Sequence, residues 1–128
     1  WQDERFWPAF RDALLREHPQ LTEAGLLKAK EHHALRYHYQ GIGRYESDAA
    51  MARGVADLQV LASLVGEAGY LHGDRPGSID AGIYGFIANI HFYDIDTPLK
   101  QCVTAHAALV RHCCSVHAAV GLAAPPAV

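Results

Sequence analysis

The sequence predicts an all-α fold, a bundle of helices, and three observations lead to this prediction. Apolar residues recur three and four positions apart through most of the chain, which places them on one face of a helix. No segment shows the apolar/polar alternation between two turn signals that is typical of a strand. The 128 residues, half of them apolar and a fifth charged, fit a single globular domain.

Composition also argues against several classes of function. The formal net charge is −3 and no basic face stands out, so nucleic acid is not an expected partner. No apolar run reaches the roughly 18 residues of a membrane span. The chain begins with Trp1 and shows no signal-peptide pattern, so we expect a piece of a longer protein. We expect a domain over residues 1–120 and a flexible tail over 121–128, "GLAAPPAV".

The first two helices are predicted from their ends. "FWPAFRDALLREHP" reads as a short helix that Pro19 stops, with Phe6, Phe10 and Leu14 four apart on its inner face. The next helix has Thr22 as its N-cap and Gly41 as its stop. Its inward residues are expected to be Leu27, Ala34 and Leu35.

The third and fourth helices carry the clearest apolar patterns. A stripe with steps of three and four predicts the third helix, with two leucines widening it: Met51, Val55, Leu58, Ala62 and Val65, then Leu61 and Leu64. The fourth helix has one face made of Ile79, Ile83, Phe86, Ile87 and Ile90. Its other face is also apolar, through Ala81, Tyr84 and Ala88. A helix that is apolar all round is buried, so this one is expected at the centre of the bundle.

Two shorter patterns complete the six predicted helices. Thr97 followed by Pro98 is typical of an N-cap with proline at the first helical position, opening a short helix through Val103. The last helix is expected to turn five residues inward: Leu109, Val110, Cys113, Val116 and Val120. Short connections between six helices favour a bundle.

A carboxylate stands where the fourth helix begins, in "GDRPGSIDAGIYGFIANI". The first turn of a helix leaves backbone N–H groups without partners, and Asp80 can accept from them and meet the positive end of the helix dipole. With Gly77 as N-cap, Asp80 is the third helical residue and supplies half of a capping box. Ser78 is the alternative cap. Either way, we expect Asp80 to be structural.

The segment "YLHGDRPGSIDAGIYGFIA" resembles the sixth-helix segment of the glutathione transferase C-terminal domain, which reads Gly-Asp-x-Pro, Ser/Thr-x-x-Asp and an apolar helix. The upstream "QGIGR" turn and the later "DTPLKQCVTAHAALVRHC" resemble the branch related to metaxin, Tom37 and the failed axon connections protein. The resemblance covers roughly residues 36–118. The hydroxyl position of the capping box falls on Gly77, and Ala107-Ala108 replaces the usual Pro-Asn. Arg44 matches the motif arginine, as a buried ion-pair partner or a surface charge.

The resemblance implies a function that is completed by another domain. In the family, a thioredoxin-like N-terminal domain binds glutathione and carries the activating residue, and no such pattern is present here. The helical domain supplies a wall for a hydrophobic electrophile and much of the contact in a homodimer. Our expected wall residues are Trp1, Arg5, Trp7 and Tyr84, with plain core packing as the alternative. Whether the parent protein is an enzyme stays open, because metaxin-like relatives serve as non-enzymatic interaction modules.

Cysteine and histidine offer two further readings. Three cysteines, two of them adjacent, make a poor disulfide framework and suggest a reducing, cytosolic compartment. Cys113 and His117 lie four apart, and two histidine-containing groups lie close in sequence: His106, His112 and Cys114, and His32, His33 and His38. No metal-ligand spacing is complete, so we expect no metal. A nucleophilic Cys113 with His117 is disfavoured by its place in a packed helix.

Overall fold

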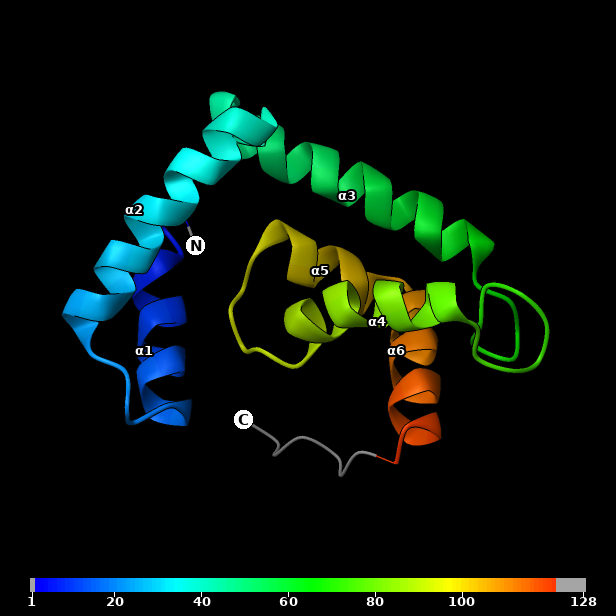
Figure 1. Cartoon of the computed structure of the whole chain (residues 1–128). Helices are drawn as coiled ribbons and strands as arrows, with labels where there is room; N and C mark the ends of the chain where they lie inside the picture. The colour runs from blue at the N-terminus through cyan, green and yellow to red at the C-terminus, as the bar shows by residue number, and fades with distance from the viewer. Residues whose placement is uncertain (1, 122–128) are drawn as a thin grey trace. The chain divides into compact units, whose positions relative to one another are not determined.

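The computed structural model describes residues 2–121, and over that range the chain forms α-helices and one 3₁₀ helix without a strand, so the all-α prediction is confirmed (Figure 1). The elements are α1 (Trp7–Glu17), α2 (Glu23–Gln40), η1 (Ile42–Arg44), α3 (Ser47–Leu64), α4 (Ser78–His91), α5 (Pro98–Ala105) and α6 (Ala107–Ala119). No helix in this range is long and apolar enough to cross a membrane. The predicted tail lies, except for Gly121, outside the described residues.

The chain divides into two compact units, the first ending at Arg53 and the second beginning at Gly54. The first unit holds α1, α2, η1 and the opening turns of α3. The second holds the rest of α3, the long loop after it, and α4, α5 and α6.

In the first unit, α1 buries a face slightly rotated from the predicted one. Trp7 and Ala13 are buried, while Phe6, Phe10 and Leu14 are half-buried. The helix starts beside Pro8 and ends at Glu17, two residues before Pro19, as proline chemistry predicts.

The ends of α2 are confirmed, and its predicted inner face is wrong. Thr22 is the N-cap, with its Oγ1 accepting from the Gly25 N–H at 3.1 Å, and Gly41 ends the helix with φ 98°. The buried residue is Leu26. The predicted inward residues Leu27, Ala34 and Leu35 are exposed. Since α1 packs on one side of α2 within this unit, only a narrow strip of α2 is covered.

The α3 stripe is confirmed with one exception. Leu58 and Val65 are buried, and the other predicted members, Met51, Val55, Leu61 and Ala62, are half-buried. The prediction for Leu64 is wrong, because this last residue of α3 is 54% exposed. Gly54 meets Leu99 of α5 closely, since a Cβ there would lie 2.8 Å from Leu99 Cδ2.

The core of the second unit lies between α3, α4, α5 and α6. Its buried members come from all four helices: Leu58, Ile87, Cys102, Val103, Leu109 and Cys113. The predicted caps of α5 are confirmed, with Thr97 Oγ1 accepting from the Lys100 N–H at 3.1 Å and Pro98 at the first helical position.

The expectation that α4 is buried all round is wrong. Ile87 is buried and Ile83 and Tyr84 are half-buried, but Ile79 is 48% and Phe86 76% exposed. Within this unit α5 and α6 contact α4, and they cover the side that carries Ile87. Val120, predicted to face inward, is also exposed, because α6 ends at Ala119.

Candidate functional site

The most enclosed polar group in the second unit is Asp80, at the start of α4. Its side chain and that of His112 on α6 are both fully buried. Asp80 Oδ2 accepts from the Gly77 N–H at 2.8 Å, and Oδ1 accepts from the Leu71 N–H at 2.9 Å. His112 Nε2 lies 3.1 Å from Oδ1. One carboxylate therefore joins the start of α4, the preceding loop and α6.

Protonation at this site follows from the contacts. Burial alone would raise the pKa of Asp80, but the N–H groups of Gly77 and Leu71, together with His112, lower it below its usual range. An ionised carboxylate only accepts hydrogen bonds, so the proton between the two side chains lies on His112 Nε2. Gly77 is the N-cap residue, and because it has no side chain, only the acidic half of the capping box forms.

Sequence reasoning missed His112 as the partner of Asp80. It lies three residues after Leu109 and four before Val116, so helical spacing alone places it on the buried face of α6. A histidine within an apolar stripe needs a polar partner when it is buried, and Asp80 was the available carboxylate. Its Nδ1 is buried without a hydrogen-bond partner in the described structure.

A second polar pair in this unit involves Tyr84, one of the expected wall residues. Its hydroxyl lies 2.6 Å from His117 Nδ1, and the His117 ring also stands against Phe92, with centroids 5.1 Å apart. Burial, with a smaller contribution from Cys113, raises the pKa of the Tyr84 phenol, so the phenol keeps its proton at neutral pH. The protonated hydroxyl of Tyr84 therefore shares a hydrogen bond with His117 Nδ1.

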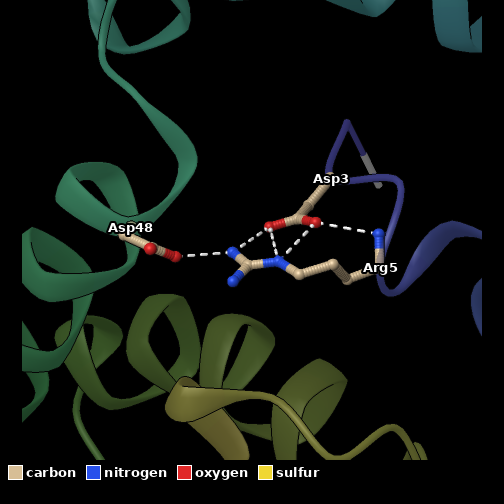
Figure 2. A network of polar contacts seen from close by, with 3 residues as sticks. All are labelled: Asp3, Arg5 and Asp48. Carbon is tan, nitrogen blue, oxygen red and sulfur yellow. Dashed lines mark hydrogen bonds and ion pairs between the residues drawn. The ribbon is translucent and has the colours of Figure 1, made fainter.

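Arg5, another expected wall residue, lies in an ion-pair network of the first unit (Figure 2). Its Nε lies 3.0 Å from Asp3 Oδ1, and its Nη2 lies 2.6 Å from both Asp3 Oδ2 and Asp48 Oδ1. The Arg5 backbone N–H donates to Asp3 as well. The guanidinium thus joins the N-terminal segment to the first turn of α3. Hydrogen bonding to Arg5 lowers the pKa of Asp3 to about 2.

Trp7 lies next to this network and is buried. Lys30 on α2 stands over its indole ring, with Nζ 4.5 Å from the ring centroid, and pairs with Glu4 at 2.6 Å. A cation over an indole face is attracted by the ring electrons. The fourth expected wall residue, Trp1, lies outside the described residues. The structure therefore places Arg5 and Trp7 in the first unit and Tyr84 in the second.

Arg44 is an exposed residue that closes the end of α2. Its Nε donates to the His38 carbonyl at 3.0 Å. That carbonyl belongs to the last turn of α2, where a helix leaves carbonyls unpaired and favours positive charge. Of the two alternatives for Arg44, the exposed position agrees with the surface charge.

The cysteines are all free, and their surroundings differ. Cys113 is fully buried, and burial raises the pKa of its thiol to about 12, so no thiolate is present at neutral pH to act as a nucleophile. Cys114 is exposed. Between residues 2 and 121, no group of three or more His, Cys, Asp or Glu side chains converges as metal ligands.

A depression of about 500 Å³ lies beside α5. Its lining residues are Asp94, Asp96, Lys100, Gln101, Thr104 and Ala105. Gln101 Nε2 donates to Asp96 across it at 2.9 Å. None of the expected wall residues belongs to this lining.

Comparison with known protein families finds a match that lies within the second unit. Residues 54–116 match the family model described as "Glutathione S-transferase, C-terminal domain". No curated protein and no solved structure matches the chain. The matched residues hold the part of α3 beyond Arg53, the α4 cap with Asp80, and most of α6 including His112. Residues 54–116 are therefore similar to the C-terminal domain of glutathione transferases.

Proposed function

We propose that this chain serves as the helical C-terminal part of a glutathione-transferase-like protein, where it supplies an apolar wall for the co-substrate and contacts for a homodimer. The observation that carries the proposal is the family match over residues 54–116. It coincides with the packed core of the second unit and with the buried carboxylate at the start of α4.

Glutathione would be held mainly by a thioredoxin-like domain of the parent protein. If the parent is an enzyme, the glutathione thiolate would attack a carbon of an apolar electrophile. A new sulfur–carbon bond would form while a leaving group departs with its electron pair or, in an addition, while a π bond breaks and its far atom takes up a proton. The helical chain would then bind the electrophile and exclude water from it. Cys113 offers no thiolate for this step, since burial raises the pKa of its thiol to about 12.

The candidates for this wall are the four residues expected from the sequence, Trp1, Arg5, Trp7 and Tyr84, each to be tested by its own substitution. Tyr84 is supported by a phenol that stays protonated at neutral pH. We further propose a cytoplasmic location, which is supported by three free cysteines.

The first test is the intact mass and N-terminal sequence of the native protein, compared with the 14.0 kDa of this chain. A native protein heavier by about one domain of thioredoxin-like sequence supports the proposal. Calorimetric titration with glutathione, followed by conjugation of an aromatic electrophile, then tests the activity. Tyr84→Phe removes only the hydroxyl, so a rise in KM for the electrophile without a change in KM for glutathione would support Tyr84 as a wall residue.

The alternative is a non-enzymatic, metaxin-like interaction module. A native protein that binds no glutathione would favour it over the transferase. The same result would leave the fold of residues 54–116 unchanged, because the family match concerns the helical domain alone.

A further inference from the structure

A segment without apolar side chains leads into α1. Residues 2–5, which we call the strap, read Gln-Asp-Glu-Arg and belong to the first unit. The Asp3 carbonyl accepts from the Phe6 N–H at 3.1 Å and from the Trp7 N–H at 2.9 Å, where α1 begins. Because the strap has no apolar side chain to bury, it is held in place by hydrogen bonds and charges.

The strap contacts α2 through one lysine. Gln2 Nε2 donates to the Lys30 carbonyl at 2.9 Å, and Lys30 Nζ donates to Glu4 Oε1 at 2.6 Å. The same ammonium group lies 4.5 Å from the centroid of the Trp7 ring. The Lys30 side chain is 13% exposed, whereas that of Glu4 is 79% exposed. Glu4 therefore holds the lysine over the indole from the solvent side.

The strap contacts α3 through one arginine. Arg5 Nη2 lies 2.6 Å from Asp48 Oδ1, and both side chains are exposed (Figure 2). Ion pairs that reach the solvent contribute little stability, and dissolved salt screens them. Two such pairs, Glu4–Lys30 and Arg5–Asp48, join the strap to its neighbours. Its attachment to α2 and α3 should therefore weaken as the ionic strength rises.

We propose that the strap is a salt-sensitive cover for Trp7, closed while its two ion pairs form and open when they are screened. Trp7 is 6% exposed, so its indole meets a ligand after Glu4 and Lys30 have moved away from it. The inference rests on the proposed function at one point. Trp7 is a candidate wall residue, and the open strap would let an apolar co-substrate reach it.

Hydrogen exchange measures the opening of the strap. The Phe6 and Trp7 N–H groups lose the Asp3 carbonyl when the strap leaves, so their exchange rates follow the open population. Raising KCl from about 10 mM to about 1 M shortens the screening length from about 30 Å to about 3 Å. Exchange at both groups should become about 2- to 30-fold faster, which is the range for two exposed pairs. The Val65 N–H, which donates to Leu61 in the second unit, is the reference.

Charge removal locates the effect in the two pairs. Glu4→Gln and Asp48→Asn each remove one charge and keep the size of the side chain. Each should speed exchange at the Trp7 N–H at low salt, and the double variant should lose most of the salt dependence. Glu23→Gln is the matched control, because Glu23 is 59% exposed and pairs with Arg11 at 3.1 Å, away from the strap. It should leave exchange at the Trp7 N–H unchanged.

Acrylamide quenching measures access to the indole itself. Acrylamide is uncharged, so its own encounter with the protein does not depend on salt. The chain has two tryptophans, and a Trp1→Phe background leaves Trp7 as its single fluorophore of this kind. The quenching constant should rise with KCl in this background, and it should already be raised at low salt when Glu4→Gln is added.

Three outcomes would overturn the proposal. Exchange at the Phe6 and Trp7 N–H groups that does not change with salt would mean that charges do not hold the strap. An equal effect of Glu23→Gln would mean a general loosening of the unit. Faster exchange without stronger quenching would mean that the strap opens but does not cover the indole. The salt series on the unaltered chain decides the first point even where a variant loses helix content by circular dichroism.

The outcome is separate from that of the proposed function, because neither measurement uses glutathione or a co-substrate. A strap that fails these tests leaves the transferase proposal standing. A parent protein that binds no glutathione leaves the salt-sensitive strap standing, without a co-substrate to admit.

Discussion

Each unit of the chain pairs a carboxylate with a basic side chain, and the surroundings of the two pairs differ. In the second unit, Asp80 and His112 are 3.1 Å apart and fully buried. In the first, Arg5 and Asp48 are 2.6 Å apart, but their side chains are 55% and 84% exposed. Distance alone would rank the Arg5 pair as the stronger. Breaking the buried pair should nevertheless cost more stability than breaking the exposed one. Water replaces a lost partner at the surface and cannot do so in the core.

The same difference extends to the backbone. Asp80 accepts two main-chain N–H groups besides His112, and these donors would have no other partner if it were lost. Asp48 accepts from a side chain that also reaches Asp3.

Removing the buried carboxylate should have the largest effect. Asp80→Ala leaves the N–H groups of Leu71 and Gly77 and the ring of His112 without an acceptor, so unfolding should require about 3–5 kcal/mol less. Asp48→Ala is the matched surface change and should cost less than about 1 kcal/mol. Urea unfolding of both variants measures the difference. Equal losses would contradict the contrast between the units.

A glycine pair compares packing in the two units. Gly69 has φ 86°, and a Cβ there would lie 2.3 Å from Ser115 Oγ, whereas Gly41 has φ 98° with nothing within 4 Å. Gly41→Ala should cost about 1 kcal/mol from its backbone conformation. Gly69→Ala should cost about 1–3 kcal/mol more, because the loop must also move away from α6. Similar unfolding midpoints for the two variants would show that the loop is not held against α6.

Acid should weaken both units through carboxylates whose pKa is lowered on folding. Such a group stabilises the fold above its unfolded pKa, near 3.8, and that stability is lost as the pH falls through the folded pKa. For Asp3 the loss falls between pH 3.8 and about 2. Unfolding midpoints measured from pH 7 to pH 2 should fall less steeply below pH 4 in Asp3→Asn. Asp80→Asn should show the same flattening and also a lower midpoint at pH 7, because an amide has only one oxygen to accept from Gly77, Leu71 and His112.

The smallest expected effect is a gain in stability. Gly77→Ser supplies the missing hydroxyl half of the capping box, and the extended backbone of Gly77, with φ −101°, accepts a serine. A serine cap exceeds a glycine cap by a few tenths of a kcal/mol, so thermal unfolding should shift upward slightly. In Gly77→Ser/Asp80→Ala the gain should be smaller, since the reciprocal bond is absent. A loss of stability in Gly77→Ser would mean that the Asp80 contact needs glycine.

The sequence predicted the features that depend on neighbouring residues and missed those that depend on distant ones. Thr22, Thr97 and the prolines act on their own helix, so helix ends could be predicted from local chemistry. The exposure of Leu35 and Phe86 depends on which helices cover them, and spacing along one helix carries no such information. Both residues have helical spacing typical of a core face.

The polar core shows the same limit. Asp80 was expected at the helix start because a first turn needs acceptors, and it is found there. Its partner His112 lies 32 residues away in the sequence, and the two meet only when α4 packs on α6. Tyr84 and His117 likewise come together across the same two helices. Helical spacing could predict that each histidine faces inward, but it could not predict which side chain that histidine would contact.

The bond from Leu71 to Asp80 has a consequence for the loop between them. The carboxylate holds the chain at Leu71 and again at Gly77, so the segment between is a short closed ring with both ends fixed. Its tip from His72 to Pro76 is exposed, and Gly73 has open space around it. A ring anchored at its base can change length at its tip without moving the helices it joins. Residues 72–76 are therefore a suitable place to attach a fluorescent or spin label that follows the domain without disturbing it.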